Sequence, residues 1–98
     1  MIIKDVLDQL EAATQPVAKP IHKGDKFKVL IIGFKSGMKL KEHTAPLPSK
    51  LTVISGNIIY AQEGKKTHLQ QYDEIDIPVN IIHSVEAKEN SLCLLTQG

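Results

Sequence analysis

After Pro16 the sequence is a succession of short β-branched runs separated by turn residues, and this spacing constrains the fold more than any other feature. The runs are too short for typical helices, and glycine, proline, asparagine and aspartate punctuate them. Many short strands at close spacing are typical of a β-sandwich or barrel. We predict strands over residues 27–34, 38–43, 51–55, 58–61, 67–70, 74–77, 81–87 and 92–96.

Local signals predict how some of these strands connect. The pair Gly56-Asn57 between two strands is a strong signal for a two-residue β-hairpin. Glu63-Gly64-Lys65 predicts a further turn. Apolar residues at strand spacing are usually core. We expect most of the core to come from Phe27, Phe34, Met38, Leu40, Val53, Ile77 and Leu94.

The N-terminal segment has a different periodicity. Apolar residues recur at helical spacing from Ile3 to Ala13, and Pro16 ends the pattern, which predicts an amphipathic helix over residues 2–13. An extended connector follows as far as Pro20. Because 98 residues suffice for one hydrophobic core, we expect a single domain over 1–98, with the helix and connector in 1–20 and a barrel in 27–96.

Charge and cysteine content limit the expected cellular location and the expected partners. The 12 basic and 11 acidic side chains nearly cancel, so no sustained basic field is available for nucleic acid. Cys93 is the only cysteine, which excludes an intrachain disulfide and predicts a reduced, buried thiol and a cytoplasmic location. No apolar window approaches the length of a membrane-spanning helix, so we expect no membrane partner.

Two segments resemble the motifs of one family. Gly37, His43 and Gly56 resemble the first cupin motif, and residues 78–83, which read Pro-Val-Asn-Ile-Ile-His, resemble the second. Asn80 stands where that motif usually has glycine, and asparagine tolerates a positive φ better than other non-glycine residues. The resemblance implies a small cupin of the RmlC-like jelly-roll superfamily, an all-β barrel with a short N-terminal α-helix. It also implies a homodimer that pairs edge strands or exchanges N-terminal segments.

The metal site that the resemblance implies is incomplete. Ala45 stands at the position of the second histidine, and the carboxylate position falls at Ser49 or Lys50. His43 and His83 remain, and strand alternation should point His83 into the barrel with Val85 and Ala87. Glu42 should face the opposite side from His43, and His68 lies on an edge-like strand where we expect solvent exposure. The expected cofactor is therefore none, or a weakly bound divalent metal ion with His43, His83 and waters.

The residues predict a ligand pocket lined by His43, His83, Ser49, Lys50 and Tyr60. Our first hypothesis is a module that binds or senses a small molecule. The alternative is a metal-dependent enzyme of the dioxygenase or isomerase type that uses His43 and His83. A third scheme resembles the sugar-nucleotide epimerases, in which a histidine acts as the base and Tyr60 or Tyr72 as the acid. Whether the domain is catalytic stays open, and the sequence names no ligand.

Overall fold

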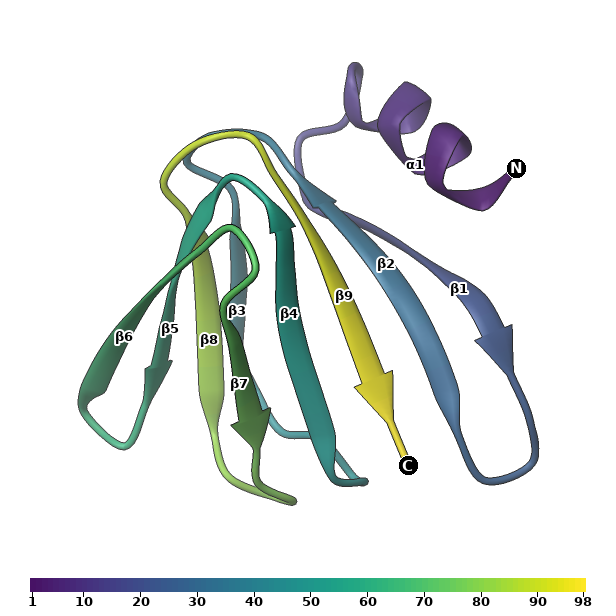
Figure 1. Cartoon of the computed structure of the whole chain (residues 1–98). Coiled ribbons are helices and arrows are strands. Elements are labelled where there is room, and N and C mark those ends of the chain that lie inside the picture. Colours follow the sequence, from purple (N-terminus) through teal and green to yellow (C-terminus); the bar gives the residue numbers. More distant parts are fainter.

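The computed structural model describes all residues from Met1 to Gly98 as two antiparallel sheets packed face to face, with one helix outside them (Figure 1). It confirms the predicted all-β jelly-roll with a short N-terminal helix. The single helix is too short to span a lipid bilayer. The elements are α1 (Ile2–Leu10), β1 (Val17–Lys23), β2 (Lys28–Phe34), β3 (Lys39–His43), β4 (Ser49–Ser55), β5 (Asn57–Gln62), β6 (Lys65–Gln70), β7 (Glu74–Ile77), β8 (His83–Ala87) and β9 (Ser91–Gln97).

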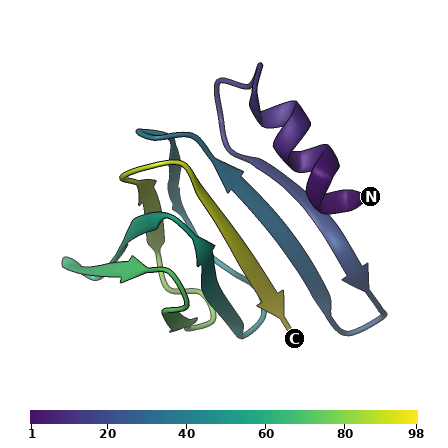
Figure 2. The ribbon, with the colours of Figure 1, turned by 45° about the horizontal axis from the view of Figure 1, so that its top comes forward.

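The strand order interleaves distant parts of the chain. The first sheet has the order β1-β2-β9-β4-β7, and the second has the order β3-β8-β5-β6. All pairs are antiparallel. Figure 2 shows the two sheets as separate layers, with the helix on the outer side of β1 and β2. The chain changes sheets repeatedly, as a jelly-roll requires.

The core lies between the two sheets and follows the period-two alternation of the strands. Phe34 and Val53 are fully buried, Ile77 is almost so, and Met38 and Leu40 pack against this cluster as predicted. Two expected core residues lie elsewhere. Phe27 precedes β2 and is 42% exposed, because the inward positions of β2 start after it. Leu94 pairs with Ile31 on the outer face, since its neighbour Cys93 takes the inward position.

The N-terminal segment forms a second, smaller apolar cluster outside the barrel. Val6 and Leu10 of α1 are buried and contact the outer face of β2 at Gly33. The helix ends at Leu10, earlier than the predicted residue 13. The predicted connector is in fact strand β1, which pairs with β2 along its length. Pro20 is compatible with this strand because β1 is the edge of the sheet, where a missing N–H is tolerated.

Gly56 does not form the predicted hairpin, because β4 and β5 belong to different sheets. Instead the chain turns at Gly56 from the first sheet to the second. Its backbone has φ +87°, and a Cβ there would overlap the Ser91 side chain and the Asn90 carbonyl. The actual tight hairpin joins β5 to β6 through Glu63 and Gly64, both of which have positive φ.

Candidate functional site

The turn before β8 places the first candidate side chain. Asn80 adopts φ +61°, which confirms that asparagine meets the conformational need of the usual glycine. Its backbone N–H donates to the carbonyl of Ala45 at 2.9 Å, so this hydrogen bond joins the two motif segments. β8 then begins at His83, whose side chain points inward and is only 4% exposed. The prediction that His83 faces the interior is confirmed.

His43 lies directly beside His83. The two residues are register partners at the ends of β3 and β8, and their ring centroids are 4.3 Å apart. Nδ1 of His43 is 2.7 Å from the Lys41 carbonyl, and Nδ1 of His83 is 3.1 Å from the Ile81 carbonyl. Because a carbonyl oxygen only accepts, both Nδ1 atoms carry the proton. In the neutral rings each Nε2 therefore offers a lone pair, and neither Nε2 has a hydrogen-bond partner.

Tyr60 extends this group inward along β5. Its ring is 1% exposed and stacks on His83 with centroids 5.7 Å apart and planes 24° apart. Its Oη donates to Oε1 of Gln62 at 2.7 Å, and Nε2 of Gln62 donates to the Glu63 carboxylate at 3.0 Å. A hydrogen-bonded chain thus runs from the barrel interior to the hairpin turn.

Burial sets the protonation of both rings. It raises the pKa of the Tyr60 hydroxyl, and the Glu63 carboxylate adds to that effect. Burial lowers the pKa of the His83 imidazole; the hydrogen bond to Ile81 acts in the opposite direction, and His43 lowers it further. Near neutral pH, His83 is therefore an uncharged acceptor next to a protonated tyrosine.

Strand register aligns these side chains into two rows on the inner face of the second sheet. The inner row is apolar apart from hydroxyl groups and consists of Leu40, Val85, Tyr60 and Thr67. The outer row, which we call the polar row, consists of His43, His83, Gln62 and Lys65. Each of the four strands contributes one side chain to it. The strand ends that carry them, the ends of β3 and β5 and the starts of β6 and β8, lie at the lower side of Figure 1.

A cavity of about 180 Å³ adjoins the polar row. It lies between the second sheet and β7, and its lining residues are Tyr60, Gln62, Lys65, Thr67, Ile75 and Asp76. Asp76 turns its carboxylate outward, where it lies 3.7 Å from Nζ of Lys50 and is 85% exposed. The space is comparable to that of a few water molecules, so it suits a small ligand.

The structure brings together some of the predicted pocket residues and separates others. His43, His83 and Tyr60 form one group. Ser49 is buried on the facing sheet, where its hydroxyl donates to the Leu47 carbonyl and accepts from Gln97. Lys50 lies on the outer face of β4 and pairs with Glu74 and Asp76.

The sequence analysis missed Gln62 and Lys65. Gln62 shares the period-two face of Tyr60, which is the signal that could have revealed it.

The donor set does not fit the metal site that this fold commonly carries. Ala45 is buried in the core, and Ser49 is engaged with other partners. No group of three histidine, cysteine or acidic side chains lies close enough to hold a metal ion. Glu42 faces outward as predicted, and His68 is exposed on edge strand β6, where it contacts Asn57 at 3.0 Å. Two imidazoles alone do not make a three- or four-ligand protein site.

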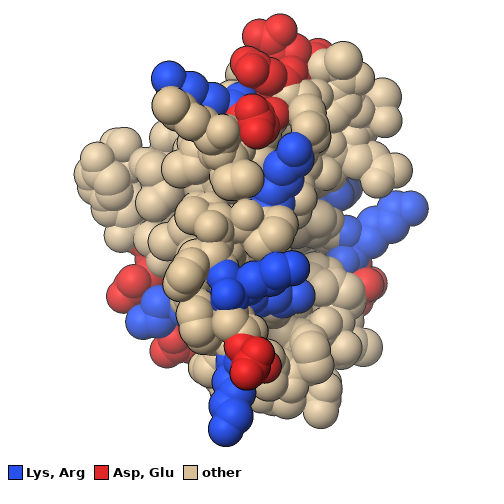
Figure 3. Space-filling model, turned by 90° about the vertical axis from the view of Figure 1, so that its right-hand side faces the viewer, with Lys and Arg blue, Asp and Glu red and all other residues tan.

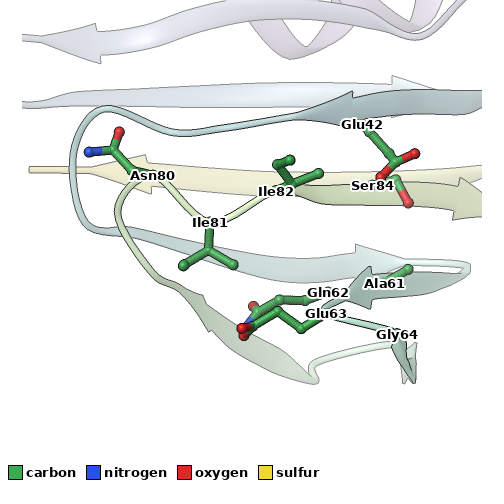
Figure 4. A pocket seen from close by; sticks show the side chains of 9 residues that line it. All are labelled: Glu42, Ala61, Gln62, Glu63, Gly64, Asn80, Ile81, Ile82 and Ser84. Carbon is green, nitrogen blue, oxygen red and sulfur yellow. The ribbon is translucent and has the colours of Figure 1, made fainter.

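The largest hollow lies on the outer face of the second sheet, where residues that flank both histidines line it together with Gln62. It measures about 670 Å³ and is lined by Glu42, Ala61, Gln62, Glu63, Gly64, Asn80, Ile81, Ile82 and Ser84 (Figure 4). Ala61 and Ser84 are register partners on the outer face of the second sheet. Neither His43 nor His83 lines this groove.

A jelly-roll barrel with an inward histidine after a Pro-x-Asn turn defines a protein of the cupin fold. Solved structures agree. A cupin superfamily protein from Desulfitobacterium hafniense has a TM-score of 0.81 and 17% identity, over 86% of this chain and 77% of its own. An RmlC-like cupin from Desulfovibrio desulfuricans has a TM-score of 0.78 and 22% identity, over 89% of both chains.

A cupin 2 conserved barrel domain protein from Leptotrichia buccalis is 29% identical, with a TM-score of 0.80. That match covers 86% of this chain and 41% of the other. No protein-family model matches the chain, and no curated protein sequence does. These likenesses show the fold and leave function to be argued from the site.

Proposed function

We propose that this chain is a small-molecule-binding module and that its ligand occupies the cavity beside the polar row. One observation carries the proposal: a row of polar side chains crosses a sheet face that is otherwise apolar and borders a small, half-open cavity. A few convergent polar groups on an apolar wall are typical of ligand sites. Gln62 and Lys65 of the polar row line this cavity, whereas His43 and His83 lie beside it and outside its lining.

The geometry favours the inner cavity over the outer groove. The outer groove presents exposed Ile82 and two glutamates on a sheet face in contact with solvent, so a ligand there loses little water. The inner cavity lies against Tyr60, which is buried and held by Gln62. Buried, positioned polar groups discriminate ligands better than solvated ones, because a wrong ligand leaves them unpaired.

The test is a fragment screen by ¹H–¹⁵N NMR on metal-free protein. We expect hits to shift the backbone amides of Tyr60, Thr67 and Ile75, which line the inner cavity and not the outer groove. Gln62→Ala should abolish these shifts, whereas Gln71→Ala, a change at an exposed turn residue, should leave them intact. Hits that gather instead on Glu42, Ile82 and Ser84 would place the binding site in the outer groove and overturn the proposal.

A weakly held divalent ion at the histidine pair is the second candidate, because both rings present Nε2 as metal-binding histidines do. With only two protein ligands the ion exchanges readily, so we expect far less than one metal per chain after purification. Elemental mass spectrometry on wild type and on the His43→Ala, His83→Ala double variant measures this. Near-stoichiometric metal that the double variant loses would favour the metal-dependent enzyme.

A further inference from the structure

The charges that face the barrel interior are all of one sign. On β2 to β9 the inward positions, assigned from register and core packing, contain no aspartate or glutamate. Their only full charges are the ammonium groups of Lys28 and Lys65, at the same end of the barrel as the histidine pair. Neither lysine forms an ion pair. Asp76 also lines the cavity, but its carboxylate is 85% exposed and lies 3.7 Å from Nζ of Lys50, so the charge that faces inward at this end is positive.

Lys65 is the cation nearest the cavity. The tight Glu63-Gly64 turn sets it directly opposite Gln62, and both side chains line the cavity. Gln62 uses its carbonyl for Tyr60 and one N–H for Glu63, which leaves a second N–H free. An ammonium and an amide N–H side by side are complementary to the two oxygens of a carboxylate. The Glu63 carboxylate lies on the turn outside the cavity lining and is engaged by Gln62.

The other side of the site needs a different ligand group. His83 lies next to Gln62 in the polar row but outside the cavity lining, and in its neutral form it presents only an acceptor at Nε2. The Tyr60 hydroxyl gives its proton to Gln62, so toward a ligand it also accepts. An acceptor in the cavity lining calls for an O–H donor on the ligand. Because the chain contains no arginine, the bidentate fork that often recognises phosphate is absent.

We propose that the ligand is a small hydroxycarboxylic acid, whose carboxylate binds Lys65 and Gln62 and whose hydroxyl group donates to Tyr60. This inference rests on the proposed function and names the class of its ligand. A cavity of about 180 Å³ accommodates an acid of three or four carbons. Longer acids must extend past the polar row into the open end of the barrel.

The experiment is an NMR titration with glycerate, which carries both kinds of group, at constant ionic strength. Glycerol lacks the carboxylate, propionate lacks the hydroxyls, and inorganic phosphate tests a different anion. We expect glycerate to bind the most tightly of the four and to shift Gln62 and Tyr60. Lys65→Met should weaken glycerate binding about tenfold, the loss expected for one charge-assisted hydrogen bond.

Lys66→Met is the matched control, because Lys66 pairs with Ala61 and faces outward. It should leave glycerate binding unchanged. Glycerol, propionate or phosphate binding as tightly as glycerate would overturn the ligand class. An unchanged affinity for glycerate in Lys65→Met would overturn it as well. Either result leaves the proposed function standing if the fragment screen still maps to the cavity. Fragments that avoid the cavity would overturn both proposals.

Discussion

Asn80 illustrates how a single backbone conformation positions the site. Its positive φ bends the chain so that β8 starts two residues before Val85, with His83 inward. The hydrogen bond from Asn80 to Ala45 then ties this turn to the loop that follows His43. The two imidazoles are thus brought together by backbone geometry, and their Nδ1 protons are fixed by the carbonyls two residues earlier. The neutral tautomer follows from the local chain path.

His83 should make stability depend on pH. Its pKa is lowered in the folded state, so between that lowered value and the ordinary value of about 6.5 the unfolded chain binds more protons. The contribution of His83 is full above pH about 6.5 and is lost as the pH falls below it. We expect the thermal midpoint to drop between about pH 7.5 and about pH 5, and His83→Gln to flatten that part of the profile.

The control for this profile is His68→Gln, because His68 is exposed on an edge strand far from the buried ring. This variant should keep the wild-type slope. Thermal unfolding followed by circular dichroism gives both curves. A slope that survives in His83→Gln would show that another group carries the pH dependence.

Among the elements, the crossing from β4 to β5 depends most on one residue. Gly56 has a positive φ and packs against the backbone and side chain of residues 90 and 91. Ser91 stabilises this corner, because its hydroxyl accepts a hydrogen bond from the Asn57 N–H and is within donating distance of the Asn57 carbonyl. This corner sends the chain from one sheet to the other and so fixes which strands become neighbours of Tyr60.

Gly56→Ala should destabilise the fold by about 2–4 kcal/mol, because the left-handed strain adds to an overlap that only backbone movement can relieve. Gly37→Ala is a close control: its φ is also +87°, but nothing lies within 4 Å of the added Cβ. It should cost about 1 kcal/mol from strain alone. Urea unfolding measures both. Equal losses would show that packing at the corner contributes nothing.

The elements also show how far sequence reasoning reached. The eight predicted strands exist, and their bounds differ by one or two residues at most ends, because hydrophobic alternation reports them directly. The predicted Gly56-Asn57 hairpin was wrong, because a Gly-Asn pair indicates a sharp turn without saying which strands pair beyond it. The polar row could not be predicted without the strand pairing, because Lys65 and Gln62 align with His83 only through the order β8-β5-β6.

At the scale of the whole molecule, the helix side combines exposed apolar and charged groups. Ile3 and Leu7 of α1 are 41% and 45% exposed beside a groove of about 570 Å³. On the neighbouring face, Figure 3 shows acidic side chains gathered at the top and lysines across the middle. The free edge of β1 is less suited to strand pairing, since Pro20 and a register shift interrupt it.

The homodimer expected from the sequence stays a prediction, and we place its contact on α1. Light scattering after size exclusion should give twice the 10.8 kDa chain mass. The double change Ile3→Glu, Leu7→Glu should yield monomer, because it puts charge on the apolar contact. Ile82→Glu, at a residue that is 56% exposed in the loop before β8, should leave the dimer intact. A wild-type monomer at high concentration would contradict the prediction.

β6 and β7 follow one another in the chain but belong to different sheets, so they are joined only at the turn over residues 71–73. Backbone hydrogen bonds of Tyr72 and Asp73 with Val53 and Gln70 hold that end, and Figure 1 shows the start of β6 and the end of β7 apart from each other. The two strands that line the cavity are therefore connected at one end only. Local separation of β6 from β7 should break far fewer contacts than unfolding of the whole barrel. Ligand exchange and global stability should thus vary independently: weakening the Val6 contact lowers the melting temperature without changing how fast the cavity fills.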